Sequence, residues 1–519
     1  MGKIFNTTGL CRPDKHYMVN IDNRLREIKK MVDHGDYFTI NRARQYGKTT
    51  TLRLLKDRLS AQYSVFSISF EGIGMNAYSS EISFCQSLCR LFYREVRYHA
   101  VAGIPSELVE EISGLRHMEI DMLELADVVS ELCSKADRPV VLIIDEVDQA
   151  SDHEVFLSFL GMLRSKYLIK EEQPTFQSVI LAGVYNIKNL KLKIRSDCQH
   201  QYNSPWNIAS DFSVDMSFQP SDIVGMLKEY EQDHRTGMDI SRMSELIYDY
   251  TSGYPFLVSR ICKIIDEHVS PVWTKEGVLE AVKELLTENN ILFDDMVKKL
   301  DDFPQLKRTL YAVLFHGDKI PYNPDTQAIS VGVMSGFLKN EQNVIVISNR
   351  IFETRLYNLF MSEELLDSKM YKAGALDKNQ FVHDGELDME RVLERFTETF
   401  TDIYAGEDIS FLEENGRRFF LLYLKPIING VGNFYIEART RDMGRTDVII
   451  DYLGRQYICE LKIWRGNEYN KRGEEQLTAY LDSYHLTTGY MISFNFNKNK
   501  KVGVQKIRIH GKTIIEAVV

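Results

Sequence analysis

The 519-residue sequence lacks any apolar run near the roughly 20 residues that a membrane-spanning helix needs. Its first residues also lack the apolar stretch of about 7 to 15 residues that marks a signal peptide, and they fit the myristoylation pattern poorly. We therefore expect a cytoplasmic protein without a membrane partner.

Cysteine is scarce and scattered. The seven cysteines are odd in number, lie far apart and mostly fall within apolar stretches, which indicates neither a disulfide framework nor a zinc knuckle. Cys85 and Cys89 are one helical turn apart, a spacing that suits either metal ligands or core thiols. Because no His or Cys pair near them could complete a metal site, we favour core thiols.

Internal repeats and low-complexity tracts are absent as well. Hydrophobic residues make up 44% of the chain and charged residues 26%, as in a globular protein of several domains. The net charge of -11 argues against indiscriminate coating of nucleic acid. From Ile409 onward, however, 17 Lys and Arg outnumber 12 Asp and Glu, so a polyanion is expected to bind at this end.

Short β-branched runs alternate with helical patterns over the first 200 or so residues, which predicts an α/β fold with a parallel sheet covered on both faces. The expected strands are 37–41, 64–70, 139–145 and 178–183, and the expected helices are 47–60, 79–99, 122–134 and 154–170. The chain is divided into a P-loop core at 1–220, a helical lid at 221–300, a winged-helix region at 301–366, an irregular linker and a helix at 367–408, and a strand-rich domain at 409–519.

A phosphate-binding loop is predicted where the first of these strands runs into an apolar-periodic helix. Five consecutive residues are expected to bind ATP: Tyr46, Gly47, Lys48, Thr49 and Thr50. Backbone N–H groups would face the phosphates, Lys48 would reach their oxygens and the Thr49 hydroxyl would ligate Mg²⁺. The motif is atypical because Arg42 stands where its first glycine is usual.

The acidic partner of this loop is predicted about 95 residues later, where an apolar strand ends in Asp145 and Glu146. Such a pair places one carboxylate, Asp145, on the Mg²⁺ ion and the other, Glu146, beside the attacking water. A chance Gly-Lys-Thr loop and a chance acidic strand end are the alternative. The two motifs together favour an ATPase.

These residues resemble the AAA-like ATPases of the group that includes archaeal-type ATPases and signal-transducing P-loop switches. The resemblance covers about 1–365 and rests on the phosphate loop and on 144–148, 181–184 and 250–258. It implies that the turn of Gly253 and Pro255 opens a lid helix that senses the nucleotide phosphates. It also makes Arg260 a candidate ATP sensor, with a surface salt bridge as the alternative.

Three residues near the C-terminus form a second candidate site: Asp447, Glu460 and Lys462. Glu460 and Lys462 are two residues apart on an expected strand and therefore point to the same face. With Asp447 on the neighbouring strand of a hairpin, two carboxylates can hold Mg²⁺ or Mn²⁺ for phosphodiester hydrolysis, while the lysine stabilises charge. A surface ladder of ion pairs is the alternative.

Asp447 followed at thirteen residues by Glu460-x-Lys462 resembles the PD-(D/E)XK nuclease superfamily, and is most similar to the C-terminal domains fused to bacterial AAA-like ATPases. The usual proline before the aspartate is Thr446 here. The resemblance covers about 409–519 and implies an α/β restriction-endonuclease-like fold with a further metal ligand at Glu414 or Glu413. The lysines at 498, 500 and 501 either touch DNA phosphates or form a solvated loop.

Two functional hypotheses follow. In the first, ATP binding or hydrolysis controls a metal-dependent nuclease that acts on DNA. In the second, the ATPase is a regulatory switch whose C-terminal domain binds nucleic acid or a partner without cleavage. The residues do not fix the oligomeric state, and a homo-oligomer is compatible with them.

Overall fold

A computed structural model divides the chain into two compact units, Met1–Ser217 and Phe218–Val519, called here the first and the second unit. The residues that it describes are 2–184, 206–268, 272–316, 318–364, 368–383, 385–404, 413–428, 432–435, 448–464, 473–475, 477–478, 481–482, 484–495, 497 and 500–519. Over these ranges, no helix has both the length and the apolar character required to cross a membrane.

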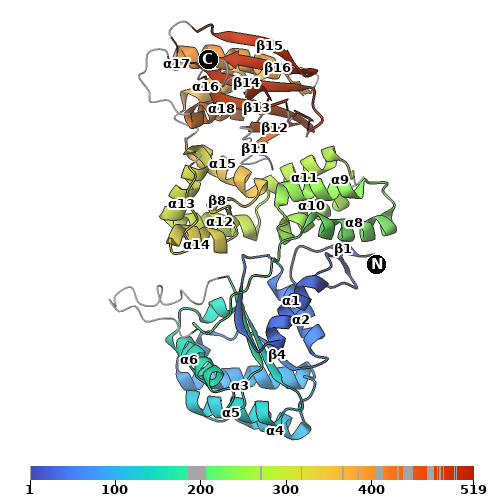
Figure 1. Cartoon of the computed structure of the whole chain (residues 1–519), viewed down its shortest axis with the longest axis vertical. Helices are drawn as coiled ribbons and strands as arrows, with labels where there is room; N and C mark the ends of the chain where they lie inside the picture. The colour runs from blue at the N-terminus through green and yellow to red at the C-terminus, as the bar shows by residue number, and fades with distance from the viewer. Residues whose placement is uncertain are drawn as a thin grey trace. The chain divides into compact units, whose positions relative to one another are not determined.

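A four-stranded parallel sheet forms the centre of the first unit (Figure 1). Its strand order is β3 (Tyr37–Asn41), β6 (Ser178–Gly183), β5 (Val140–Asp145) and β4 (Ser64–Ser69). All three neighbouring pairs are parallel, and each strand lies within one residue of its predicted bounds. The prediction of a parallel sheet is therefore confirmed.

Helices cover both faces of this sheet because its strands are apolar on both sides. One face is covered by α1 (Asp22–Asp33) and α2 (Lys48–Leu59), which pack with Val141 and Ile143 of β5. The other face is covered by α3 (Glu81–Tyr98), α5 (Met122–Lys135) and α6 (Glu154–Leu168), which pack with Leu142 and Ile144, while α4 (Ser106–Leu115) contacts α3. Successive residues of one strand thus serve two separate cores.

The first unit also bears out one smaller prediction and holds a buried tryptophan. Cys85 and Cys89 are both buried in the core between α3 and the sheet, as expected for core thiols. Trp206 is fully buried, and its indole N–H donates a hydrogen bond of 2.9 Å to the Thr39 hydroxyl. Both features serve packing.

The second unit begins with four helices, α8 (Pro220–His234), α9 (Ile240–Thr251), α10 (Pro255–Glu267) and α11 (Lys275–Thr287). The turn between α9 and α10 holds Gly253 at φ +72°, a left-handed conformation that favours glycine. Pro255 is the first residue of α10, where its missing N–H costs no hydrogen bond. Gly253 and Pro255 therefore favour this turn between α9 and α10.

The next segment alternates helices with one hairpin. It contains α12 (Ile291–Asp302), α13 (Pro304–Tyr311), a π-helical turn (Ala312–His316), α14 (Gln327–Met334), β7 (Leu338–Glu341), β8 (Val344–Ile347) and α15 (Arg350–Glu364). β7 and β8 pair in an antiparallel manner. The winged-helix assignment of this segment stays a prediction.

A mixed six-stranded sheet dominates the C-terminal region (Figure 1). Its order is β11 (Gly432–Tyr435), β12 (Val448–Tyr452), β13 (Arg455–Ile463), β14 (Thr488–Phe494), β16 (Lys512–Val518) and β15 (Gly503–Ile509). The strands β13, β14 and β16 are parallel to one another, whereas the β11–β12, β12–β13 and β15–β16 pairs are antiparallel. The α17 (Met389–Tyr404) and α18 (Glu413–Ile428) helices pack against this sheet.

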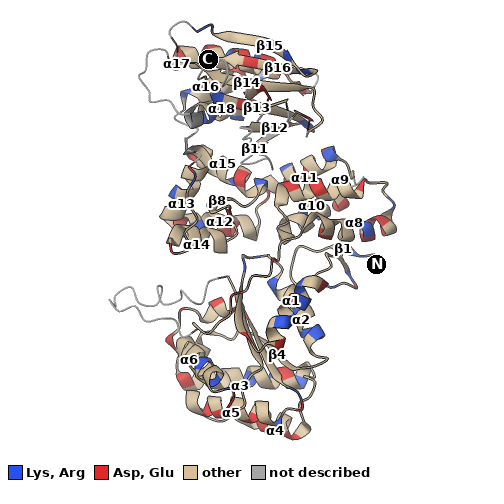
Figure 2. Cartoon of the chain, in the orientation of Figure 1, with Lys and Arg blue, Asp and Glu red and all other residues tan. Residues whose placement is uncertain are grey.

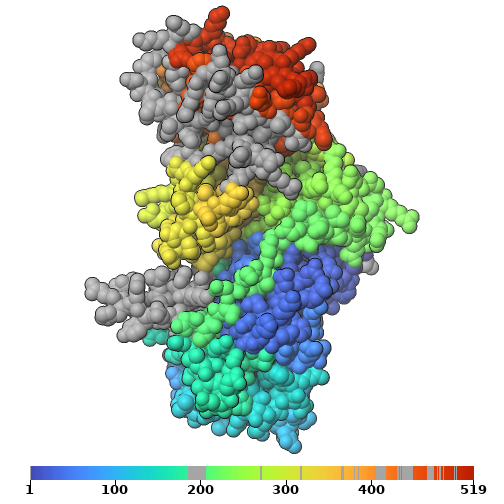
Figure 3. Space-filling view, viewed as in Figure 1, coloured from blue at the N-terminus to red at the C-terminus, as the bar shows by residue number. Residues whose placement is uncertain are grey.

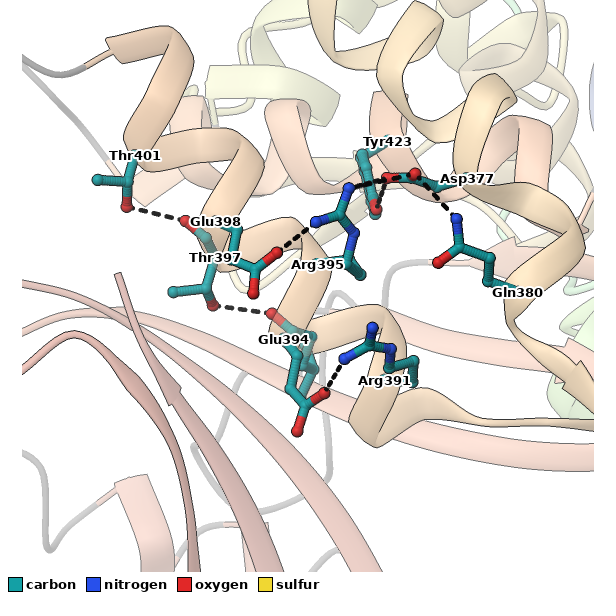
Figure 4. Close-up of polar contacts among 10 residues, drawn as sticks. Asp377, Gln380, Arg391, Glu394, Arg395, Thr397, Glu398, Thr401 and Tyr423 are labelled. Atoms are coloured by element: carbon teal, nitrogen blue, oxygen red, sulfur yellow. Dashed lines mark hydrogen bonds and ion pairs between the residues drawn. The ribbon is translucent and has the colours of Figure 1, made fainter.

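The expectation of an irregular linker after residue 367 is wrong for 368–383. This segment contains α16 (Lys369–Asp377), whose Gly374 lies so close to α18 that an added Cβ would be 2.1 Å from the Tyr423 carbonyl oxygen. The Asp377 carboxylate accepts hydrogen bonds from the Tyr423 hydroxyl at 3.0 Å and from Arg395 at 3.3 Å (Figure 4). The polar composition that suggested a linker therefore belongs partly to a packed helix.

Candidate functional site

The predicted phosphate loop lies between β3 and the first turn of α2. Gly47 caps α2 at φ +80°, so the backbone reverses into a helix whose N-terminal N–H groups are directed towards the loop. Gln45 also has a positive φ of 56°. The local conformation is the strand, turn and helix that an anion-binding loop requires.

Thr49 and Asp145 meet although 96 residues separate them in the sequence. The Thr49 hydroxyl donates a hydrogen bond of 2.9 Å to Asp145 Oδ2. The contact forms because β3 and β5 are parallel strands of one sheet, so the loop after β3 and the last residue of β5 share its carboxyl edge. A hydroxyl beside a carboxylate is a donor set that fits Mg²⁺.

Lys48 is 7% exposed, and its ammonium group donates hydrogen bonds to the carbonyl oxygens of Arg42 at 2.9 Å and of Ala43 at 3.1 Å. Burial lowers the pKa of Lys48. The carboxylates of Glu146 and Asp148 raise this pKa and so offset part of the effect of burial. The lysine is thus held inside its own loop and next to the acidic end of β5.

Glu146 follows β5 in a left-handed conformation with φ 54°, which is uncommon for a residue with a side chain. Its backbone N–H donates a hydrogen bond of 2.9 Å to Asp145 Oδ1. Burial raises the pKa of the Glu146 carboxyl, and the neighbouring charge of Asp145 raises it further. A carboxylate with a raised pKa suits a group that accepts a proton near neutral pH.

Arg42 occupies the position of the missing glycine, and its side chain contacts Asn41 and the segment that precedes α8. Its guanidinium donates hydrogen bonds to the carbonyl oxygens of Asn41 at 2.9 Å and Val214 at 2.7 Å. It also lies 5.2 Å from the ring centre of Phe212. An arginine is accommodated at this position because Asn41, Val214 and Phe212 all contact its side chain.

Tyr46 and Thr50, the two end residues of the predicted ATP-binding segment, contact residues outside the loop. The Thr50 hydroxyl accepts a hydrogen bond of 3.2 Å from the Cys11 backbone N–H, which joins the N-terminal segment to α2. The Tyr46 side chain packs at the edge of the core shared by α1 and α2. α2 itself carries Lys48, Arg53, Lys56 and Arg58 against a single acidic residue (Figure 2), and the last three of these cations pair with carboxylates.

Arg260 of α10 forms a two-point ion pair within the second unit. Its Nε donates a hydrogen bond of 2.9 Å to the Glu288 carboxylate, which a second contact from Nη2 reinforces, and Glu267 lies 3.7 Å away. The hydrogen bonds that Arg260 donates to the Glu288 carboxylate raise the pKa of Arg260. The salt bridge that the sequence offered as one alternative is therefore present, and the sensor role stays a prediction.

At the second candidate site, Glu460 and Lys462 lie on one face of β13 and are 1% and 8% exposed. The Lys462 ammonium is 3.3 Å from Glu460 Oε1. Asp447 lies outside the described residues, and of Glu414 only the backbone, in α18, is described. Within the ranges given above, no group of three or more His, Cys, Asp or Glu side chains is arranged to hold a metal ion.

A comparison with family models matches residues 14–361 to the AAA-like domain, and this range is more than half of the chain. The chain belongs to the AAA-like domain family. Its function is accordingly ATPase-like. The matched range contains the phosphate loop, Asp145 and Arg260, and it ends before the mixed C-terminal sheet begins.

Similar solved structures include a Walker-type ATPase of Pyrococcus abyssi, with 14% identity over 68% of this chain and 99% of that chain, and a TM-score of 0.48. The ORC2 protein of Aeropyrum pernix has 12% identity, covers 69% of this chain and 98% of its own, and has a TM-score of 0.39. The RuvB branch migration motor of Thermotoga maritima has 12% identity, coverages of 66% and 95%, and a TM-score of 0.30. A search of curated proteins finds no match.

The roles of two residues of the AAA-like domain were not predicted from the sequence. Asp148 Oδ2 accepts a hydrogen bond of 2.5 Å from the Val184 backbone N–H, so it joins the end of β5 to the end of β6. Glu71, two residues after β4, contributes negative charge that raises the pKa of Glu146. Their position in the sequence could have indicated these roles. Each residue follows a strand at the carboxyl edge of the sheet, where ligands of parallel sheets bind.

Proposed function

We propose that the AAA-like domain hydrolyses ATP and that this reaction controls a metal-dependent nuclease site in the C-terminal region. The observation that carries the ATPase half is the hydrogen bond between Thr49 and Asp145, because it unites the two motifs that phosphoryl transfer needs. Thr49 and Asp145 would hold Mg²⁺, which supplies positive charge to the phosphates when it is bound.

The remaining residues have separate tasks in this proposal. Lys48 binds the phosphate oxygens and stabilises their negative charge, with the N–H groups of Gly47 and its neighbours as further donors. Glu146 orients the attacking water and accepts its proton at the carboxylate. The raised pKa of Glu146 supports this role, since it brings the carboxyl closer to working pH.

The rate of ATP hydrolysis should fall on acidification at a higher pH than an ordinary glutamate would impose. Burial and the charge of Asp145 raise the Glu146 pKa, so its proton-accepting form is lost as the pH falls through that raised value. A kcat profile against pH, with ATP affinity measured in parallel, checks this expectation. Glu71→Gln removes a like charge and should move the acid limb to lower pH; an acid limb at or below pH ~4.3, the value of an ordinary glutamate, would contradict it.

Control of the C-terminal region is supported by contacts inside the second unit. The Tyr250 hydroxyl, at the end of α9 and three residues before Gly253, donates a hydrogen bond of 2.9 Å to the Asp451 carboxylate on β12. Arg350 of α15 pairs with Asp249 at 2.5 Å and donates a hydrogen bond of 2.9 Å to the Tyr484 hydroxyl. We propose that the turn at Gly253 passes the nucleotide state to the sheet through these contacts.

The nuclease half rests on Glu460 and Lys462, which share a buried face of β13. With Asp447 and Glu414, Glu460 would hold Mg²⁺ or Mn²⁺, which activates water against a phosphodiester when it is bound. Lys462 would stabilise the charge that develops on the phosphate. DNA is the proposed substrate.

The second candidate is a regulatory switch whose C-terminal domain binds nucleic acid or a partner without cleavage. The close pairing of Lys462 with Glu460, at 3.3 Å, favours it, because a paired lysine and glutamate also serve a purely structural role. The two candidates differ in what Glu460 does.

Glu460→Ala should lower DNA cleavage by about 100-fold or more, while leaving ATP hydrolysis unchanged. The measurement is cleavage of plasmid DNA with Mg²⁺ or Mn²⁺, with and without ATP, for the full chain. Glu390→Ala is the matched control, because it removes a carboxylate from α17 on the opposite side of the sheet. ATP hydrolysis without any cleavage that depends on Glu460 would favour the switch and reject the nuclease.

A further inference from the structure

A groove of about 470 Å³ lies where the parallel strands of the C-terminal sheet end. Trp464 directly follows β13, Asn495 directly follows β14, and Gln505 belongs to the edge strand β15. Lys500 and Lys501, from the segment before β15, complete the polar lining. β15 is largely exposed, and the C-terminal residues, coloured red, form part of the surface in Figure 3.

The groove lies on the same face of the sheet as the candidate nuclease residues. Lys462 pairs in register with Ser493, so both side chains point to one face. Trp464, two residues after Lys462 and directly after β13, continues this alternation, and its backbone N–H donates a hydrogen bond of 2.9 Å to the Phe494 carbonyl oxygen. Trp464 lies four residues after Glu460, which corresponds to a distance of about 13 Å along an extended strand. A polynucleotide in the groove would therefore be continuous with the face that carries Glu460.

Two buried polar side chains, Glu516 and Ser493, lie beside the groove, and Glu516 holds the lining residue Gln505 in place. The Glu516 carboxylate of β16 is 1% exposed and accepts hydrogen bonds from the Ser493 hydroxyl at 2.6 Å and from the Gln505 side-chain amide at 2.7 Å. Asn495 is 8% exposed, and its side-chain oxygen accepts a hydrogen bond of 3.0 Å from the Asn497 N–H. The Gln505 amide is thus positioned by β16, and the Asn495 amide by the backbone that follows β14.

We propose that this groove binds an unpaired end of a DNA strand, with a base stacked on Trp464 and the backbone phosphates on Lys500 and Lys501. An indole beside lysines and amides is the combination that single-strand binding uses, since every base offers a π-face to an aromatic ring. In a duplex these faces are hidden by stacking, so the groove selects strands that are open. The choice of DNA rests on the proposed function.

Binding of fluorescent oligonucleotides to the full chain, followed by anisotropy without divalent metal, tests the proposal without any need for cleavage. A 15-nucleotide oligothymidylate should bind at least about 10-fold more tightly than a 15-base-pair duplex or the matching oligouridylate. Trp464→Ala should weaken oligothymidylate binding about 10-fold or more, and Trp464→Phe should restore much of the loss. Lys500→Gln with Lys501→Gln should make the slope of log affinity against log salt less negative by about 1.4.

Lys506→Gln is the matched control for charge. Lys506 lies on β15 but faces the other side of the sheet, where it pairs with Glu390 at 2.8 Å, so its loss should leave binding unchanged. Equal affinity for duplex, tighter binding of RNA, or full binding by Trp464→Ala would each overturn the proposal. If these outcomes occurred while Glu460→Ala still abolished cleavage, the proposed function would stand and only the groove assignment would fail.

Discussion

Glu146→Gln should lower the rate of ATP hydrolysis by about 100-fold to 10,000-fold, the range that a positioned general base contributes. The substitution preserves the size of the side chain but removes the carboxylate that would accept the proton of the attacking water. ATP binding should survive, because the phosphates are expected to rest on Lys48 and on the backbone N–H groups of the loop. Single-turnover hydrolysis and equilibrium ATP binding, measured on the same preparation, separate the two effects.

Asp152→Asn provides the matched control for this experiment. Asp152 is an exposed carboxylate six residues after Glu146, and its loss changes the net charge by the same amount. It should leave hydrolysis within about twofold of the wild type. If Glu146→Gln hydrolysed ATP as fast as the Asp152→Asn variant, Glu146 would not be the base.

Gly253→Ala should destabilise the second unit by more than about 3 kcal/mol. A left-handed conformation costs an alanine about 1 to 2 kcal/mol, and Gly253 has φ +72°. An added Cβ would also lie 1.9 Å from the Phe218 carbonyl oxygen, so the backbone must move. That movement strains the hydrogen bond of 2.8 Å that the Phe218 N–H donates to the Gly253 carbonyl oxygen.

Thermal unfolding of the full chain measures this effect, with Gly225→Ala as the control. Gly225 lies inside α8, and a Cβ added there would meet nothing within 4 Å, so alanine should stabilise that helix by about 0.5 to 1 kcal/mol. The two glycine variants are thus expected to change stability in opposite directions. An unchanged unfolding temperature for Gly253→Ala would show that the turn has another conformation in solution.

The features that the sequence predicted well are those encoded within a few residues. The strands of the first unit are short apolar runs, and the turn from β3 into α2 depends on neighbours in the chain, so these elements were found with nearly correct bounds. The meeting of Thr49 with Asp145 was also predictable, because parallel strands bring their carboxyl ends to one edge.

The features that the sequence did not predict depend on contacts between distant residues. The Arg42 guanidinium donates a hydrogen bond to the carbonyl oxygen of Val214, which is 172 residues away in the sequence. No residue near Arg42 indicates this partner. The hydrogen bond between Tyr250 and Asp451 spans 201 residues. The α16 helix escaped because its packing uses Gly374 and the buried carboxylate of Asp377 in place of an apolar stripe.

Equilibrium ATP binding by Lys48→Ala tests the central claim most directly. Removal of the ammonium group should weaken binding by about 10-fold to 100-fold, the worth of a charge-assisted hydrogen bond to phosphate. Arg53→Ala, which removes one positive charge from an exposed turn of the same helix, should bind ATP like the wild type. Wild-type affinity in a folded Lys48→Ala variant would contradict the assignment of the nucleotide site.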